Sequence, residues 1–390
     1  MFDFSIFTTF CVFIRLWFFN VQLVANRHVG YIFSTPDKTV SVWSAIQSSC
    51  PSLTGIDGAP ASMVPTPYLF VGWMQSIYSV LFTRRRDGRS NITYDREIVS
   101  FSDGGITALD WYPARPSSLS HDCTHIVVVL PGGGGASSEY HIRCLSKSLA
   151  AARHHVVVLN HRGCGGVALT SPKMYHATHT DDIRVTMSLL SQNYPAATLS
   201  CVAFSLGALM LTRYLAEHPT DSKVSAAVAI SCPFDTQVAF AAMDRPSVFN
   251  DYVFNPNLAK AVKRYIAKHQ DVIQSGSVCY DFAAIYKATR LRQIDTLLCA
   301  PAGGFGSCEE YYAGASTAAL IPKIATPFLA INSRDDSCVP IEAVPLSAFE
   351  SNPYTALALV NHGGHLGFFT GLVPTIWYID PVIEFLSAIF

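Results

Sequence analysis

The chain has 390 residues, of which 50% are hydrophobic and only 14% are charged. A chain this apolar has ample surface to bury and little self-repulsion, which excludes a disordered protein. Its 27 lysines and arginines are offset by 28 aspartates and glutamates, so it lacks the positive field that nucleic-acid binding requires. Length alone allows two or three domains, although α/β folds often exceed about 250 residues as one unit.

The first part of the chain is strongly apolar. From Phe4 to Ala25, thirteen residues are Phe, Ile, Leu or Val, and a single residue, Arg15, is charged. The segment is about as long as a bilayer core is thick. The free energy of its insertion into a bilayer stays favourable by a small margin after the unfavourable contribution of Arg15 is included. We therefore predict a membrane anchor over residues 1–28, which makes the protein membrane-associated through one N-terminal span. The alternatives are a cleaved signal peptide without its positive n-region and an apolar helix in the interface or on the body.

Residues 29–95 are rich in Pro, Ser and Gly and predict an extension that wraps a domain over residues 96–390. A hairpin is predicted around the turn at Asp103–Gly105. Farther on, short runs without polar alternation are typical of strands buried on both faces. These runs are Ile126–Leu130, Val156–Asn160, Ser200–Phe204, Ala227–Ser231, Phe328–Asn332 and Ala356–Val360. The pattern predicts an α/β fold with a mostly parallel sheet, flanked by helices and interrupted by a helical insertion over residues 234–315.

Ser205 lies at the junction between a predicted strand and a predicted helix, with Ala203 two residues before it and Gly207 two residues after it. A serine on such a sharp turn exposes its hydroxyl above the sheet, and small neighbours relieve the crowding of the backbone. Because serine is a weak nucleophile at its own pKa, it needs a base to take its proton. Ser205 is our candidate nucleophile.

An acid and a base follow in the chain order that such a site requires. Asp335 and Asp336 come after the fifth predicted strand, and His362 and His365 come after the sixth. Taken singly, an Asp pair is often a turn or a helix cap, and a histidine between glycines can simply lie in a tight loop. All three loops follow strands of one parallel sheet, however, and ligand sites in such sheets lie at that edge. The combination predicts a Ser–Asp–His site.

The run Pro131 to Gly135 follows the first predicted strand and has two interpretations. A phosphate-binding loop needs a lysine after its glycines, or an acid about 20 positions later. The lysine is missing, and Asn160 stands where the acid is expected. We favour an oxyanion hole, in which backbone N–H groups stabilise a developing negative charge. The expected donors are the N–H groups of Gly133 and Leu206.

From about Pro67 to its carboxyl terminus the chain resembles the membrane-anchored esterase and acylglycerol-lipase branch of the α/β-hydrolase superfamily. Its relatives there are the α/β-hydrolase-domain proteins of types one and three and their bacterial and plant cousins. The matching motifs are Tyr94-x-Arg96-Glu97, Asp103-Gly104-Gly105, Leu109-Asp110-Trp111, Leu130-Pro131-Gly132, Asn160–Gly166, Thr180–Arg184, Phe204–Gly207, Tyr311-Tyr312, Asp335-Asp336 and Gly364–Gly367. The resemblance implies an α/β-hydrolase fold with Ser205 as nucleophile, Asp336 as acid and His365 as base.

Within this resemblance, Asp336 is preferred over its neighbour because acid-x-x-Val-Pro is the usual spacing. His365 is preferred because it lies inside the Gly-Gly-His-Leu-Gly match. The chain departs from the family pattern at Ala203, at Ser337 and in its four consecutive glycines, and none of these changes removes a functional group.

We expect a serine hydrolase that cleaves carboxylic esters of lipids, such as acylglycerols or phospholipids, through an acyl-enzyme. The expected partners are an ester substrate and a membrane, with no nucleic acid, and no metal or organic cofactor is needed. The insertion, with Phe234, Phe240 and Phe249, is expected to cover the site as an apolar cap. One alternative is an acyltransferase, to which the spacing of His176 and Asp181 points weakly. The other is a non-catalytic scaffold that retains the fold.

Overall fold

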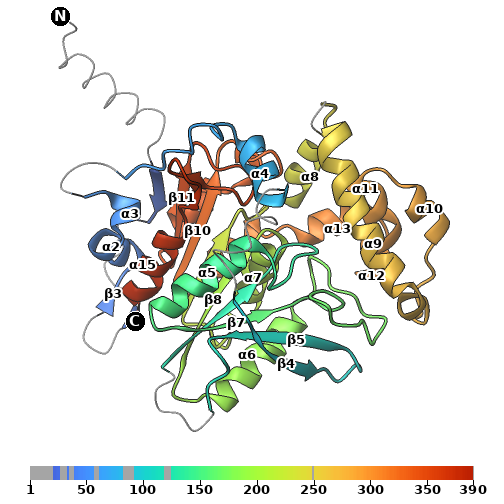
Figure 1. The fold of residues 1–390 in the computed structure, drawn as a ribbon, viewed down its shortest axis with the longest axis horizontal. Helices are drawn as coiled ribbons and strands as arrows, with labels where there is room; N and C mark the ends of the chain where they lie inside the picture. Colours follow the sequence, from blue (N-terminus) through green and yellow to red (C-terminus); the bar gives the residue numbers. More distant parts are fainter. Residues whose placement is uncertain are drawn as a thin grey trace, which may run out of the picture.

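A nine-stranded sheet lies at the centre of the protein, which the computed structural model describes for residues 21–26, 33–34, 39–56, 61–81, 92–117, 124–247 and 250–389 (Figure 1). Its order is β1-β11-β10-β9-β8-β6-β7-β5-β4. The strands are β1 (Val21–Ala25), β4 (Asp95–Ser100), β5 (Ile106–Tyr112), β6 (His125–Leu130), β7 (His155–Leu159), β8 (Thr198–Phe204), β9 (Ala226–Ile230), β10 (Phe328–Ser333) and β11 (Thr355–Val360). All neighbours from β7 to β11 pair in parallel, whereas β5 and β1 run against the strands beside them.

The six apolar runs of the sequence form β6 to β11, and their ends agree to within two residues. Successive residues of a strand point to opposite faces, so each strand supplies two hydrophobic cores. In β6, Val128 and Leu130 belong to one core, and Val127 and Val129 belong to the other. Burial on both faces explains why these strands lack polar alternation, and it confirms the predicted mostly parallel sheet flanked by helices.

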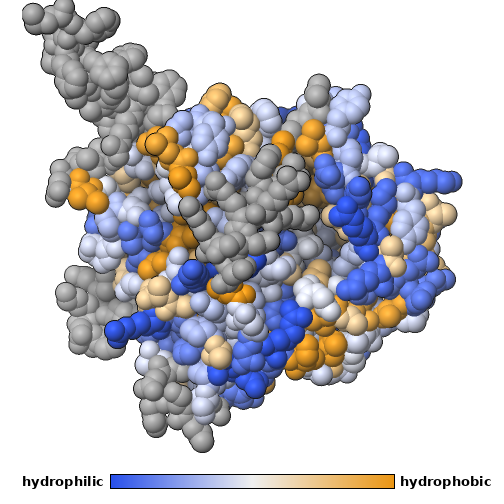
Figure 2. Space-filling model, viewed as in Figure 1, coloured by the Kyte–Doolittle hydropathy of each residue, from blue (hydrophilic) through white to orange (hydrophobic). Residues whose placement is uncertain are grey.

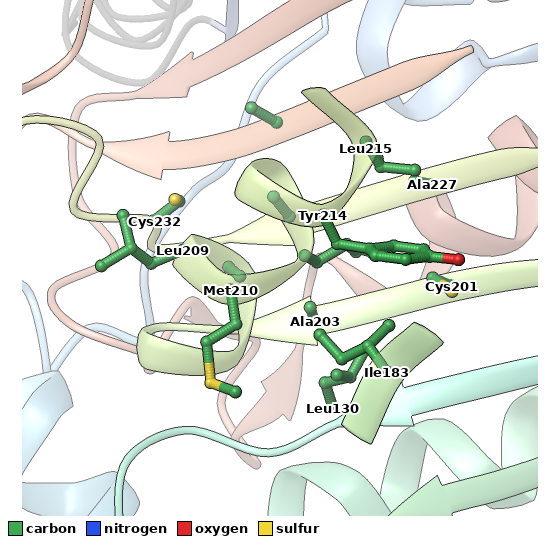
Figure 3. Close-up of a cluster of buried hydrophobic side chains, with 14 of the residues drawn as sticks. Leu130, Ile183, Cys201, Ala203, Leu209, Met210, Tyr214, Leu215, Ala227 and Cys232 are labelled. Carbon is green, nitrogen blue, oxygen red and sulfur yellow. The ribbon is translucent and has the colours of Figure 1, made fainter. Parts of the chain in front are cut away.

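Helices cover both faces of the sheet (Figure 1). One face packs against α2 (Val42–Ser49), α3 (Pro51–Thr54), α5 (Tyr140–Ala151) and α15 (Ile379–Ile389). The other packs against α6 (Asp181–Asn193), α7 (Leu206–Glu217), α13 (Cys308–Ala315), the 3-10 helix η4 (Ala318–Lys323) and α14 (Leu346–Ser351). Figure 3 shows part of this second core, where Met210 and Tyr214 of α7 lie beside Ile183 of α6 and Ala203 of β8. The two layers fix the position of α7, which begins directly after Ser205.

The N-terminal prediction needs a correction. Residues 1–20 of the predicted anchor lie outside the described residues, but its last part, Val21–Ala25, is strand β1 and pairs antiparallel with β11. A short apolar run suits an edge strand as well as the end of a membrane helix, and Val24 and Ala25 are buried in the core. Within the described part of the chain, no helix is long and apolar enough to cross a bilayer.

Between β1 and β4 the chain makes a small hairpin, β2 (Phe33–Ser34) and β3 (Thr39–Val40), and then α2, α3 and α4 (Gly72–Leu81). The N–H and hydroxyl of Ser52 donate to the carboxylate of Glu384, at 3.0 and 2.8 Å, and so tie α3 to α15. A second small hairpin, β12 (Phe369–Thr370) and β13 (Thr375–Ile376), follows β11. A short 3-10 helix, η5 (Ile341–Ala343), lies between β10 and α14.

The predicted insertion contains several helices between β9 and β10. They are α8 (Thr236–Asp244), η2 (Asn250–Phe254), α9 (Asn255–Gln274), α10 (Phe282–Lys287), α11 (Leu291–Ile294), η3 (Asp295–Cys299), α12 (Ala300–Ala302) and α13. Helices α9, α10, α11 and η3 share a hydrophobic core of their own, in which Ile266 and Ile294 pack with Leu169 and Met174 of the segment before α6. Helices α8 and α13 pack on the main core instead.

Two of the three aromatic residues expected to form a cap pack against other aromatic rings. Phe234 is fully buried in the main core, with its ring centroid 5.4 Å from that of Phe349, and Phe240 stacks on Tyr312 at 4.3 Å. Phe249 lies outside the described residues. Because both rings pack against other aromatic rings, Phe234 and Phe240 stabilise the base of the insertion.

Candidate active site

Ser205 lies on a strained turn between β8 and α7. Its φ of 50° and ψ of −115° fall outside the regions that a serine ordinarily adopts, and strain of this kind is characteristic of functional sites. The N–H of Ser205 donates to the carbonyl of Ile230 at 2.9 Å, which holds the turn against β9. Gly207 is required here, since a Cβ at this position would lie 2.3 Å from the carbonyl oxygen of Pro131. Ala203 is fully buried in the core, where its small side chain fits in place of the usual glycine.

His365 connects the two other predicted residues. Its Nε2 lies 2.9 Å from Ser205 Oγ, and its Nδ1 lies 2.8 Å from Asp336 Oδ2. A carboxylate can only accept, so Nδ1 carries the hydrogen and Nε2 is left to accept the serine hydroxyl. The structure thus brings Ser205, His365 and Asp336 together in one hydrogen-bonded chain. They come from three loops at the carboxyl ends of β8, β10 and β11.

The surroundings favour a charged imidazole. Burial by itself lowers the pKa of His365, but the negative charge of Asp336 and its hydrogen bond outweigh burial and raise the pKa well above its usual value. The thiol of Cys338, next to the ring, acts in the same direction. An imidazole that gains a proton readily from a hydroxyl is what a general base requires.

The neighbouring carboxylates have separate contacts. The side chain of Asp336 is inaccessible to solvent, and its Oδ1 accepts the N–H groups of Cys338 at 2.7 Å and Val339 at 3.0 Å. These two bonds leave Oδ2 for His365 and fix its direction. The preference for Asp336 over its neighbour, which the superfamily spacing implied, therefore agrees with the geometry.

Asp335 instead shapes the histidine loop. Its Oδ1 accepts the N–H groups of Gly363 and Gly364, both at 2.9 Å, and the hydroxyl of Ser333 at 2.6 Å. Its Oδ2 lies 3.2 Å from Nδ1 of His362. Burial opposes the charge of Asp335, but these hydrogen bonds outweigh burial and lower its pKa. His362 thus pairs with Asp335, while His365 faces the serine.

The glycine run lies over the serine turn. A Cβ on Gly132 would lie 3.4 Å from Cβ of Ser205, and one on Gly133 would lie 3.4 Å from the side chain of Leu206. Of the two predicted oxyanion donors, Leu206 follows the nucleophile directly, and Gly133 lies against the side chain of Leu206. Gly134 has a φ of +70°, a backbone conformation that favours glycine. This conformation explains why at least one of the four consecutive positions is a glycine.

Two side chains that the sequence did not single out hold this loop. The hydroxyl of Tyr175 accepts the N–H of Gly134 at 2.9 Å, and Nε2 of His161 lies 2.9 Å from the carbonyl of Pro131. The two rings stack, with centroids 4.5 Å apart. His161 belongs to the motif Asn160–Gly166, which supported the resemblance to the family. The sequence did not reveal its contact with the carbonyl of Pro131.

Helix α4 supports the histidine loop from a segment predicted to be an extension. The hydroxyl of Ser76 accepts the N–H of His365 at 2.7 Å, and Oε1 of Gln75 accepts the N–H of Phe369 at 2.7 Å. The two backbones approach so closely that a Cβ on Gly364 would lie 2.0 Å from the carbonyl oxygen of Gly72. The sequence shows periodicity here over Trp73–Phe82, but no motif pointed to a contact with the histidine loop, because serine and glutamine are common in solvated loops.

Other motif residues form a frame next to the site. Arg162 is almost fully buried, and its guanidinium makes two hydrogen bonds to Asp182 at 2.7 Å and one to Asp103 at 2.6 Å. Arg96 binds Asp110 in the same bidentate way, with both distances 2.7 Å. Arg162 and Asp110 are buried, and each is paired with opposite charge that offsets the cost of burial, whereas Arg96 is partly exposed. Arg162 ties the turn of the β4–β5 hairpin and helix α6 to the loop after β7, and the pair of Arg96 and Asp110 joins β4 to β5.

Within the described residues, the acid, the base and a neighbouring cysteine also have the spacing of metal ligands. The ligand atoms of Asp336, Cys338 and His365 lie within 4.8 Å of one another. Two of the three are already engaged in the hydrogen-bonded chain to Ser205, and burial raises the pKa of the Cys338 thiol, which disfavours the thiolate that binds metals. The donor set fits the serine site better than a cation site.

A comparison with protein families identifies the fold. Residues 126–372 match the family described as the alpha/beta hydrolase fold, and this match spans the serine, the acid and the histidine. The chain belongs to the α/β hydrolase family. The expected family is thereby confirmed, and the serine of this α/β hydrolase lies on a turn between a strand and a helix, as is typical of the fold.

Curated relatives of this α/β hydrolase come from yeast and human. The monoacylglycerol lipase of Saccharomyces cerevisiae is 27% identical over 389 residues, covering 90% of this chain and 85% of the relative. Phospholipase ABHD3 of Homo sapiens is 26% identical over 342 residues, covering 87% of this chain and 80% of the relative. A medium-chain fatty acid ethyl ester synthase/esterase of S. cerevisiae is 31% identical over 370 residues, covering 78% and 80%.

Proposed function

We propose that this α/β hydrolase cleaves carboxylic esters of lipids by a serine mechanism. Lipases, phospholipases and esterases among its relatives support an ester hydrolase. The observation that carries the proposal is the chain of two short hydrogen bonds, 2.9 Å from Ser205 to His365 and 2.8 Å from His365 to Asp336. Acylglycerols and phospholipids are the proposed substrates.

In the proposed reaction, the hydroxyl oxygen of Ser205 attacks the ester carbonyl while Nε2 of His365 takes the proton. The charge of Asp336 stabilises the imidazolium that forms and keeps the ring oriented. His365 then donates the proton to the leaving alcohol, and an acyl-enzyme remains. A water molecule, deprotonated by the same imidazole, releases the fatty acid and restores Ser205.

The negative charge on the carbonyl oxygen needs donors that are already in place. The N–H groups of Gly133 and Leu206 are proposed for this role, because Leu206 follows Ser205 and Gly133 lies against the side chain of Leu206. Loss of one such donor typically costs about 2.7–4 kcal/mol in the transition state. The bond from Gly134 to Tyr175 and the contact of His161 with Pro131 keep the glycine run from relaxing.

A fluorophosphonate probe tests the nucleophile, since it reacts covalently with activated serines. We expect the full chain to be labelled, the Ser205→Ala variant to remain unlabelled, and both to unfold at similar temperatures. Activity should then be measured on short-chain esters, monoacylglycerols and phospholipids. Labelling that persists in Ser205→Ala would refute the nucleophile, and a native chain that is never labelled favours the scaffold.

A second candidate is acyl transfer to an alcohol, which the name of the yeast ethyl ester synthase/esterase favours. The acyl-enzyme would then react with an alcohol in place of water. The spacing of His176 and Asp181 adds no support, because His176 bonds Thr178 at 3.0 Å and Asp181 binds Lys173 at 3.0 Å. Reactions with added ethanol that yield only free fatty acid would exclude transfer.

A further inference from the structure

Helix α4 is apolar on its outer side as well as toward the core. Its inner side contacts the histidine loop through Gln75 and Ser76 and packs Met74 and Tyr78 against the hydrophobic core. On its outer side, Trp73 and Val80 are exposed. The outer side of a surface helix is ordinarily polar. Exposed apolar residues on α4 indicate that this side meets something other than water.

The exposed side of α4 continues into a larger apolar surface, which we call the apolar rim. It consists of exposed residues from two segments, Val64, Tyr68, Phe70, Trp73, Val80, Leu372 and Val373. The two segments are joined by hydrogen bonds, from Tyr68 Oη to the carbonyl of Leu372 at 3.1 Å and from Thr370 Oγ1 to the carbonyl of Val64 at 2.7 Å. In Figure 2 separate patches of hydrophobic surface are visible along the upper edge of the molecule.

The apolar rim carries no charge of its own and borders the candidate active site. Residues 61–81 and 366–379, which build it, contain no Asp, Glu, Lys or Arg, although 14% of the chain is charged. Helix α4 links the two, because its outer side belongs to the rim and the hydroxyl of Ser76 on its inner side accepts the N–H of His365. An uncharged surface with tyrosine and tryptophan at its edge suits the boundary between lipid headgroups and acyl chains.

The position of the N-terminal strand points to the same occupant. Val21, the first residue of β1, pairs with Val360, the last residue of β11, so it lies at the end of the sheet that carries His365. Its N–H donates to the carbonyl of Ala61 at 3.0 Å, where the first rim segment begins. The apolar sequence that precedes Val21 is therefore joined to the folded body at the same edge as the rim.

From these features we propose that the apolar rim docks on the surface of a phospholipid bilayer and turns the candidate active site toward it. Phe70, Trp73 and Leu372 enter the headgroup region, and the serine site lies against the lipid. The inference is independent of the reaction, because a chain without the catalytic hydroxyl retains the rim. Burial of exposed apolar area on the lipid supplies the binding free energy.

The test uses the full chain with Ser205→Ala, so that no lipid is hydrolysed, and phosphatidylcholine vesicles with or without bromine on the acyl chains. Bromine quenches tryptophan only at close range. Comparison with a Trp73→Phe variant isolates Trp73 from the other four of the chain's five tryptophans. We expect the protein to float with the vesicles and its Trp73 emission to be lower on brominated lipid.

A matched pair of variants identifies the surface. Phe70→Ser/Leu372→Ser removes rim residues that are 58% and 79% exposed, and Ile98→Ser/Tyr252→Ser removes residues away from α4 that are 51% and 79% exposed. The rim pair should weaken partition into vesicles about tenfold and relieve the quenching of Trp73, whereas the control pair should change neither. All four substitutions are at exposed sites, so thermal unfolding should be similar.

Three results would overturn the proposal. One is a chain that floats while Trp73 emits equally on brominated and ordinary lipid. Another is an equal loss of partition in the rim pair and the control pair. The third is a dimer in sedimentation that dissociates only in the rim pair, with no vesicle binding, because a second copy of the chain would then be the occupant. A hydrolase that docks but cleaves no lipid ester would leave this inference standing and refute the proposed substrate.

Discussion

Replacing Asp336 by asparagine tests the electrostatics of the candidate site. Asp336 accepts two backbone N–H groups and faces Nδ1 of His365 at 2.8 Å. Asparagine is nearly isosteric, so the turn is expected to survive, but the charge that raises the pKa of His365 is lost. Its amide can also donate to Nδ1, which would force the imidazole into the tautomer that cannot accept the serine proton.

Two effects of Asp336→Asn are expected, and they differ in kind. The turnover number should fall by about 10⁴, which corresponds to about 5 kcal/mol of transition-state stabilisation. Activity requires neutral His365, so it is lost as the pH falls through the pKa of this residue. Because that pKa drops in the variant, the acidic limb of kcat/KM should move to lower pH. The assay is hydrolysis of a soluble short-chain ester over a range of pH.

Asp335→Asn is the matched control, since it removes the adjacent carboxylate. An asparagine oxygen can still accept the N–H groups of Gly363 and Gly364, and His365 keeps its partner. A smaller loss of turnover is expected, with the acidic limb unmoved. If Asp335→Asn caused the large loss and the shift while Asp336→Asn caused neither, the assignment of the acid would be wrong.

Two further predictions concern support for the site and the pH dependence of stability. Ser76→Ala removes the acceptor of the His365 N–H and should lower kcat about tenfold without changing KM or the acidic limb, since an unsatisfied N–H costs about 1–3 kcal/mol; a raised KM alone would contradict this positioning role. Burial raises the pKa of Asp295 from 3.8 to about 6, so its contribution to stability is full below pH 3.8 and is lost as the pH rises through 6. The free energy of unfolding of Asp295→Asn, minus that of the wild type, should therefore rise by up to about 3 kcal/mol from pH 4 to pH 7, as measured by urea unfolding. If this difference were the same at both pH values, the raised pKa of Asp295 would be contradicted.

The sequence was sufficient for the parts of the fold that follow from hydrophobic pattern. Fully buried strands have no other interpretation once they alternate with helices, so β6 to β11 could be predicted closely. The serine and the histidine could be predicted because their loops follow those strands. In both cases local pattern and chain order agree, and no knowledge of distant contacts is needed.

Long-range contacts account for the parts that the sequence did not reveal. Val21–Ala25 has the composition of a membrane segment, and only its pairing with β11 distinguishes it from one. Ser76 acts through a bond to His365, 289 residues away in the chain. Tyr175 likewise binds the glycine run from a segment without a motif. Such residues have ordinary types and spacing, so they become visible only when the chain is folded.

Strand β1 also determines how the protein can be shortened for study. It covers the outer side of β11, a strand buried along its whole length. Removal of residues 1–25, which include strand β1, would leave that side of β11 without its hydrogen-bond partners. The open apolar edge would favour self-association. A shortened chain that begins just ahead of Val21 keeps the edge closed, so it should aggregate less than one that begins at Arg27.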